Sequence, residues 1–413
     1  MKSAVTLLRI LTAASLFLVA GTVAGQEPPA PREPATETRE EEGKIIDLDS
    51  VEDEPEGSLL DRFLPGERTV RLFGYAEAHF NDPKTGTMRD GDDNRTEIHR
   101  FVIGVGYDFS ERLHFEAEVD FEHSFDEPEV EFAHVTLDLP YDIHLLVGSV
   151  LVPVGFLNET HEPPTFYSVE RPQVNTLLIP TTWQEIGAGV RGSVGPYLSY
   201  RAYLLATLQA SGFTPLKGIR GGRTKTVNAV TNDVAGVVRL ESTPFLGTQI
   251  GLSGYIGGAD QDAVGVGRVT VTMAEADVRL NYFNFEVRGV GVYTYITGTE
   301  DLPELDSGGS PTGKAPARQQ WGGYGELAYH FAPHLPEGTL HDIVPFVRFE
   351  HINTQGEVRS QFDRDDRGLR NILVAGVAVY PHPDVVFKVD VEDWRDGDGD
   401  RVTRLNLGVG LSY

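Results

Sequence analysis

The C-terminal stretch alternates between apolar and polar residues over two long segments, and this restricts the possible folds more than any other feature. In VVFKVDVEDW, the residues Phe387, Val389 and Val391 alternate with charged residues. The final segment, RLNLGVGLSY, continues the pattern and ends on Tyr413. A period of two indicates a β-strand with one apolar face. A last strand of this kind that ends on an aromatic residue is typical of transmembrane β-barrels.

The same pattern repeats along the chain from Thr69 onward, in about sixteen segments, which fits the even strand numbers of bacterial barrels. Many segments are long enough for a tilted strand to cross a bilayer, whereas strands of soluble sheets are shorter. Short links such as SER, PYD and GP alternate with long links such as 155–182 and 211–232. We therefore predict an all-β fold, a transmembrane antiparallel β-barrel spanning 68–413, with short periplasmic turns and long outer loops.

The N-terminal residues differ in composition from the barrel region. Residues 1–25 combine basic residues, a short apolar core and small residues, which predicts a secretory signal peptide; the alternative, a membrane anchor helix, needs a longer core. Residues 26–67 are rich in Pro and Glu and cannot bury a core, so we expect a disordered, acidic periplasmic tail. The alternative is a brief plug-like contact by the apolar residues between 45 and 64. Export and a barrel together predict the bacterial cell outer membrane.

The composition argues against several classes of function. The chain has no cysteine, which excludes thiol catalysis, and its net charge of −27 disfavours nucleic-acid binding. No GxSxG, HExxH or Walker motif occurs, so we assign no catalytic residue and no cofactor. The RDGDGD loop resembles a carboxylate-rich Ca²⁺ site but lacks the final Glu of an EF-hand loop, and a solvated hairpin turn is the favoured interpretation. No metal ligand is assigned.

A barrel of about sixteen strands leaves an aqueous channel, so the inward face should be polar. Alternation places opposed basic and acidic rows there, which makes a transverse field and a wet wall. The predicted pore-lining residues are Arg100, Arg191, Arg201, Arg239, Arg288, Arg348, Glu116, Glu118, Asp120, Lys388 and Asp390. The alternative is the solvent-facing side of a soluble β-sandwich.

The long link 155–183 is rich in Pro and aromatic residues and too apolar to be disordered. Long loops in compact proteins are usually functional or disordered, so we expect this one to fold into the lumen and narrow it. Its candidate constriction residues are Glu159, His161, Glu162, Glu170 and Arg171. We expect His161 to act as a hydrogen-bonding residue rather than a metal ligand.

Aromatic residues gather at the predicted strand ends. Trp183, Trp321 and Trp394 fall at the long-loop ends, whereas Tyr141, Tyr282 and others lie near the short turns. Two such levels match the aromatic girdles at the two membrane interfaces, although aromatic residues also favour strand ends in soluble β proteins.

Three segments resemble the phosphate-selective porin O and P family: PTTWQEIGAGVRG, the ending GVAVYPHPDVVFKVDVEDW…NLGVGLSY, and FGYAEAHF near the start. This resemblance implies a 16-stranded outer-membrane barrel, usually trimeric, whose third outer loop constricts the pore. It also implies an arginine ladder, for which Arg100, Arg191, Arg201, Arg239 and Arg288 are the candidates. The chain departs from that family in its scarcity of Lys and its acidic loop, and an acidic lumen favours cations.

We therefore predict an outer-membrane porin, not an enzyme, through which small hydrophilic solutes or ions diffuse passively. Its expected partners are outer-membrane lipid, lipopolysaccharide and, in a homotrimer, two further copies of the chain. The alternative is a barrel that acts as an enzyme or adhesin through its extracellular loops.

Overall fold

The computed structural model describes residues 69–83, 94–123, 127–224, 226, 229–263, 265–336 and 338–413. The predicted signal peptide (1–25) and acidic tail (26–67) lie outside these residues. Within the described part of the chain, no helix is long and apolar enough to cross a membrane.

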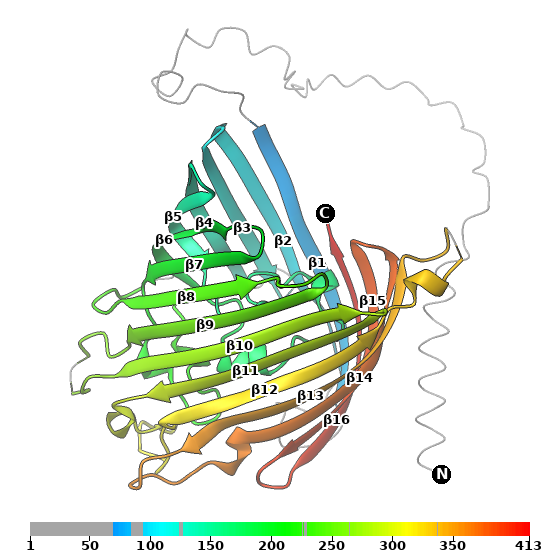
Figure 1. The fold of residues 1–413 in the computed structure, drawn as a ribbon. Coiled ribbons are helices and arrows are strands. Elements are labelled where there is room, and N and C mark those ends of the chain that lie inside the picture. Colours follow the sequence, from blue (N-terminus) through cyan, green and yellow to red (C-terminus); the bar gives the residue numbers. More distant parts are fainter. Residues whose placement is uncertain are drawn as a thin grey trace, which may run out of the picture. The chain divides into compact units, whose positions relative to one another are not determined.

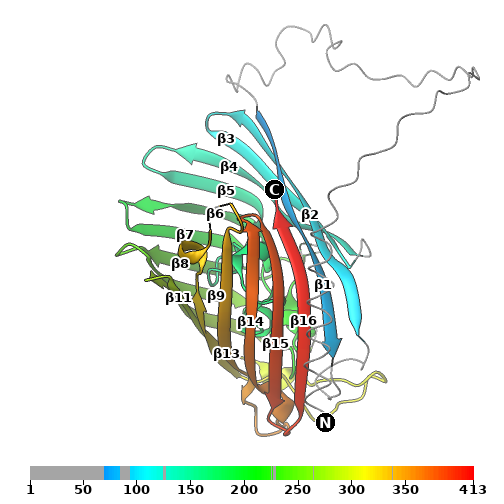
Figure 2. The same cartoon turned by 90° about the vertical axis from the view of Figure 1, so that its right-hand side faces the viewer.

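Sixteen antiparallel strands form one closed barrel, which confirms the predicted fold class (Figure 1). Each strand pairs with its neighbours in sequence, and β1 pairs with β16 to close the ring (Figure 2). The strands are β1 (Thr69–Pro83), β2 (Arg95–Ser110), β3 (Leu113–Glu122), β4 (Glu127–Leu139), β5 (Ile143–Leu151), β6 (Gln184–Val194), β7 (Leu198–Leu205), β8 (Ala235–Ser242), β9 (Thr248–Gly258), β10 (Thr270–Tyr282), β11 (Phe285–Ile296), β12 (Gln319–Tyr329), β13 (Asp342–Glu357), β14 (Leu369–His382), β15 (Val385–Asp396) and β16 (Arg401–Ser412).

The apolar residues of the strands point outward, the reverse of a soluble sheet. On β15, Phe387, Val389 and Val391 are 37–40% exposed, whereas Lys388 and Asp390 between them are buried inside the barrel. On β9 and β8, outward Leu252, Ile256 and Val238 are likewise exposed. An exposed apolar belt around a barrel is stable only against lipid, so this surface is the membrane-facing one.

The connections differ in length between the two ends of the barrel. At one end most links are tight: the β10–β11 hairpin turns through Phe283 and Asn284, both with positive φ, as in the two-residue turns that match strand twist. Residues 330–341 are the longer exception at this end. The other end carries most of the long links, among them 152–183 and 206–234. The predicted alternation of short turns and long loops thus describes the barrel.

The prediction that all three tryptophans belong to an interfacial girdle is wrong for two of them. Trp183 is buried inside the barrel against Tyr255, and Trp394 is buried beneath Arg404. Trp394 shares the strand parity of Asp390 and therefore faces inward, whatever its height along β15. Trp321 is 41% exposed on the outer face. At the short-turn end, the exposed aromatic residues include Tyr141, Tyr197, Tyr282 and Phe283.

Replacing Val389 by arginine should lower the free energy of unfolding by about 2–4 kcal/mol, because the charge would sit near the bilayer midplane. The same replacement at Val385, on the same face but beside the β14–β15 turn, should cost at most about 1 kcal/mol. Guanidinium titration of protein folded in phospholipid vesicles measures both values. Equal losses at the two positions would contradict a lipid-facing belt.

Candidate functional site

The link between β5 and β6 lies inside the barrel. It contains two short helical turns, η2 (Pro163–Thr165) and the π-helical η3 (Val174–Leu178), and it buries Phe166, Val169 and Leu178. Its polar contacts reach inward-facing side chains of β1, β4, β7, β9, β10, β11, β13, β14 and β15. A segment bonded to strands around most of the ring must cross the interior.

Charged wall residues hold the middle of this loop through its backbone. The Arg348 guanidinium donates to Ser168 Oγ at 2.6 Å, and Lys388 Nζ donates to the Ser168 carbonyl at 3.0 Å. The Val169 N–H in turn donates to Asp390 Oδ2 at 2.6 Å. Hydrogen bonds to ionised partners are roughly twice as strong as neutral ones. Three charges from β13 and β15 therefore fix two adjacent loop residues.

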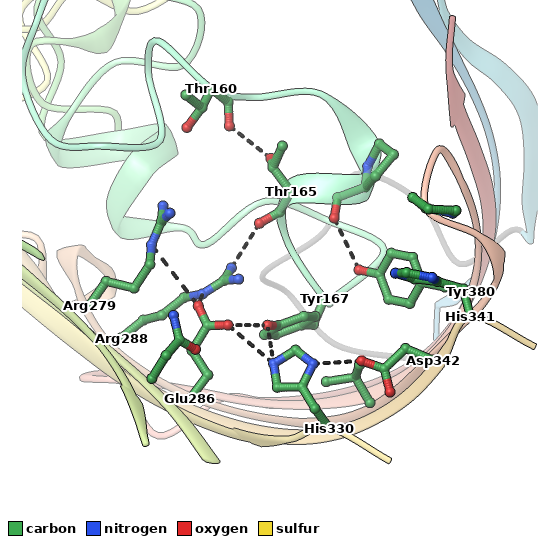
Figure 3. A pocket seen from close by; sticks show the side chains of 14 residues that line it. Thr160, Thr165, Tyr167, Arg279, Glu286, Arg288, His330, His341, Asp342 and Tyr380 are labelled. Atoms are coloured by element: carbon green, nitrogen blue, oxygen red, sulfur yellow. Dashed lines mark hydrogen bonds and ion pairs between the residues drawn. The ribbon is translucent and has the colours of Figure 1, made fainter. Parts of the chain in front are cut away.

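A second anchor joins the loop to β11 and the short-turn end of the barrel (Figure 3). Tyr167 donates its hydroxyl to Glu286 Oε2 at 2.6 Å, and Arg288 donates to the Thr165 carbonyl at 2.8 Å. His330 extends this chain, because its ring lies 3.2 Å from Glu286 and 2.6 Å from Asp342.

A cavity of about 460 Å³ opens beside this anchor, between the loop and the wall. Arg279, Arg288, His330 and Tyr380 are among the residues that line it (Figure 3). Arg279 stacks its guanidinium on Phe156 of the loop, 4.6 Å from the ring centre. The cavity therefore has both a charged wall and an aromatic one, which suits a small hydrated solute more than a lipid.

Three of the five predicted constriction residues bond to strands of the barrel wall, and Arg171 bonds within the loop itself. Glu159 accepts from Arg201 at 3.1 Å, and His161 contacts Glu131 at 3.1 Å. His161 is thus a hydrogen-bonded residue of the loop. The remaining placements are as follows: Glu170 accepts from Asn81 at 3.1 Å, Arg171 donates to Thr182 at 3.0 Å, and Glu162 is partly exposed.

The predicted pore-lining arginines fall into separate groups. Arg191, Arg201 and Arg239 stand directly opposite one another across β6, β7 and β8 and form one row. Arg100 lies elsewhere, within an acidic cluster on the β2–β4 wall, 3.0 Å from Asp120 and 2.8 Å from Glu131.

The other predicted lining residues lie on the same inward face. Glu116 pairs with Arg71 at 3.2 Å, and Glu118 is buried beside it on β3. On the far wall Arg288 pairs with Glu286 at 2.5 Å. Basic side chains thus gather in the arginine row on β6–β8, and acidic side chains gather in the cluster on β2–β4. On β10–β15 the inner wall carries both signs of charge.

A second loop also folds inward, which the sequence analysis did not predict. Residues 206–224 start at β7 and reach β13 and β14: the Pro215 carbonyl accepts from Thr354 at 2.8 Å, and the Leu216 carbonyl accepts from Arg370 at 3.2 Å. Phe213 and Ile219, which belong to this loop, are buried. In the sequence, these apolar residues within a Gly-rich link were the signal that the loop folds inward.

The aspartates of the RDGDGD loop do not converge on one point. Asp393 pairs with Arg395 at 2.9 Å and with Arg401 at 2.6 Å. Asp396 instead accepts from the Asp400 N–H at 2.9 Å, a bond that closes the hairpin. This arrangement is a charged turn between β15 and β16.

Comparison with known proteins places this barrel among its relatives. No family model matches the chain. An uncharacterized protein of Aquifex aeolicus (strain VF5) is 30% identical over 364 residues, which cover 83% of this chain and 80% of the relative. The chain belongs to the family of that Aquifex protein.

Solved structures show the same fold at much lower identity. The outer membrane channel DcaP of Acinetobacter baumannii gives a TM-score of 0.57 at 11% identity, over 84% of this chain and 97% of that one. Salmonella typhi OmpF, solved with daunomycin, gives 0.56 at 11%, over 83% and 97%. An anion-selective porin from Comamonas acidovorans gives 0.52 at 9%, over 84% and 100%.

The porin-like barrel and its lipid-facing belt confirm the outer-membrane location. The resemblance to the phosphate-selective porins stays a prediction, because the structures named above share only the fold with this chain.

Replacing Tyr167 by phenylalanine should weaken the loop anchor by about 1 kcal/mol and leave Glu286 short of a donor. We expect backbone amides of residues 163–169 to exchange hydrogen several times faster. Tyr282→Phe is the matched control, because that hydroxyl is exposed on the outer surface. Unchanged exchange in Tyr167→Phe would show that the hydroxyl does not hold the loop.

The anchor should also respond to pH through His330, which follows β12. Hydrogen bonds to Glu286 and Asp342 raise the pKa of His330 above its usual value. The folded protein thus binds the titrating proton of the His330 ring more tightly than the unfolded chain does. The resulting stabilisation is full below about pH 6.5 and is lost as the pH rises through the higher pKa of the folded state.

Denaturant midpoints measured between acidic and mildly alkaline pH test this dependence of stability on the protonation of His330. The wild-type midpoint should fall on the alkaline side more than that of His330→Gln. His382→Gln serves as the control, since that ring is exposed at the same end of the barrel. Identical pH profiles for wild type and His330→Gln would exclude the proposed linkage.

Proposed function

We propose that the protein is a passive diffusion channel for small hydrophilic solutes or ions in the outer membrane, and that loop 155–183 constricts its pore. The observation that carries this proposal is a loop bonded to most of the ring from inside a closed barrel with a charged inner wall. The outer membrane channel and the anion-selective porin among the similar solved structures support it over the enzyme or adhesin alternative.

The inner charges support a preference for cations in this channel. Glu116, Glu118 and Asp120 form an acidic strip on β3, separate from the arginine row on β6–β8. Arg201 and Arg239 of that row are already paired with Glu159 and Asp277. Glu116 and Asp120 are paired in the same way, with Arg71 and Arg100, and Glu118 is the acid of the strip without an ion-pair partner among the described residues. An acid of this kind on the wall concentrates cations in the pore. This sets the proposal apart from phosphate selectivity, which the family resemblance implies.

The proposal extends to assembly. The resemblance to the phosphate-selective porins implies a homotrimer, embedded in outer-membrane lipid and lipopolysaccharide. The apolar outer belt offers the surface on which both lipid and further copies could pack.

Single-channel recording in planar bilayers tests conduction and the loop together. Deleting residues 158–172 should raise the conductance roughly twofold or more, because an inward loop narrows a water-filled barrel. Deleting 306–310, the tip of an exposed hairpin between β11 and β12, is the control and should change conductance little. A purified, folded protein that never conducts would overturn the channel proposal and favour the enzyme or adhesin alternative.

The reversal potential in a KCl gradient measures ion preference separately. We expect the sign for cation selectivity, and Glu116→Gln with Glu118→Gln should shift it toward zero. A potential of the opposite sign, strengthened by phosphate, would instead support the anion selectivity that the resemblance implies.

A further inference from the structure

Three imidazoles and several carboxylates gather at the long-loop ends of β1, β2 and β3. Glu97 stands between two of the rings: its Oε1 lies 3.0 Å from His99 Nδ1, and its Oε2 lies 3.2 Å from His123 Nδ1. His79 stacks on His99 with ring centres 4.5 Å apart, and His123 meets the edge of His99 at 5.5 Å. This group takes no part in anchoring loop 155–183, except where His79 approaches Glu170.

The local backbone explains why these side chains meet. The β1–β2 register shifts by one residue at Glu77 and Ala78, so that Arg100 pairs with Glu77 while Ile98 pairs with Ala78. A bulge of this kind re-aims the side chains on either side of it. Beyond the shift, Ile98 is exposed on the outer face, and Glu97 and His99 turn toward the interior. The His123 N–H donates to the His99 carbonyl at 3.0 Å and holds the third ring in place.

We propose that Glu97, His99 and His123 bind a divalent transition-metal ion of the zinc class. Their ligand atoms all lie within 4.8 Å of one another. Tetrahedral coordination with bonds of about 2.0–2.1 Å places ligand atoms about 3.3 Å apart. The two oxygens of Glu97 lie 3.0 and 3.2 Å from the two ring nitrogens, which is close to that value, so side-chain shifts that bring both nitrogens around one oxygen would let an ion fit.

The ligand types point to the class of ion. Two imidazoles and one carboxylate suit zinc, copper or nickel, whereas magnesium and calcium prefer oxygen ligands alone. Three protein ligands leave one tetrahedral position for water or a passing anion, as in zinc sites that exchange ligands. His123 is 46% exposed at its side chain, so the site is open to an ion arriving from outside.

The surroundings of the site carry both signs of charge. A cavity of about 310 Å³ adjoins it, lined in part by Glu77, Glu170, Arg171 and Arg220. Arg100 also borders this cavity, but its guanidinium is held by Asp120, Glu122 and Glu131. His79, buried beside Glu77 at 3.2 Å, forms the inner side of the group. The site therefore lies at the outer edge of the lumen and does not depend on whether the barrel conducts.

A second group, Glu118, Glu131 and His161, also brings three ligand atoms together. Here Arg100 already lies 2.8 Å from Glu131, and all three side chains are buried. A guanidinium in that position neutralises the carboxylate and repels a cation. The proposal is therefore confined to Glu97, His99 and His123.

Isothermal titration of the full, detergent-folded protein, purified without a polyhistidine tag, tests the proposal with Zn²⁺ as the probe. We expect one Zn²⁺ per chain and no comparable binding of Mg²⁺ or Ca²⁺. His123→Ala should weaken binding by at least the 10–100-fold that loss of an outer partner typically costs. His144→Ala is the matched control: its ring is also partly exposed and bonded to Asp138 and Asp142, but at the other end of the barrel.

Two further measurements separate a metal site from a change in folding. His123→Gln keeps the size and polarity at an exposed position, and its far-UV circular dichroism should match that of the wild type. X-ray absorption at the zinc edge should show two imidazole nitrogens in the wild type and one in the His123 variants. Absence of tight Zn²⁺ binding by the wild type, or binding by folded His123→Ala and His99→Ala as tight as that of the wild type, would overturn the proposal.

Discussion

Lipid offers no hydrogen bonds, and this constraint governs the rest of the structure. Each backbone N–H and C=O within the membrane must find a partner in the chain, so a sheet can cross only when it closes on itself. The pairing of β1 with β16 provides that closure, with nine residue pairs from Tyr75 and Ser412 to Pro83 and Arg404. Once the ring is closed, strand alternation divides all side chains between a lipid-facing and an interior surface.

Charged side chains, which lipid excludes, then lie on the interior surface. Buried ionised groups are costly unless they are paired or hydrogen-bonded. The inner wall meets this requirement in two ways: by ion pairs within the wall, as between Arg239 and Asp277, and by bonds to the loop backbone, as from Arg348 and Asp390. Loop 155–183 thus adds hydrogen-bond partners to charges of the wall, and the wall satisfies loop amides that lie away from bulk water.

The features set by this constraint were predictable from the sequence. Strand parity on β15 follows directly from the alternation of Val389 and Asp390, and strand lengths indicated a bilayer. The failures arise where a residue's neighbours come from distant segments. The prediction for Trp394 used its position near the long-loop end of β15, but strand parity decides the direction of the side chain and points it inward. Residues 206–224 carry too few apolar residues for a pattern, and only Phe213 and Ile219 show that the loop folds inward. The grouping of His99 with His123 depends on a register shift, which no periodicity reveals.

The same pairing limits which charges remain to act on a solute. Lys388, Arg348 and Asp390 are committed to the loop, and Arg201 is committed to Glu159, so their fields are largely neutralised locally. Arg191 in the arginine row and Glu118 in the acidic strip have, among the described residues, no ion-pair partner. A charge without a local partner acts over a longer range in a narrow channel with low-dielectric walls than a paired one does. The selectivity of the barrel therefore rests on the few wall charges that the loop does not bind, rather than on the full count of acids and bases.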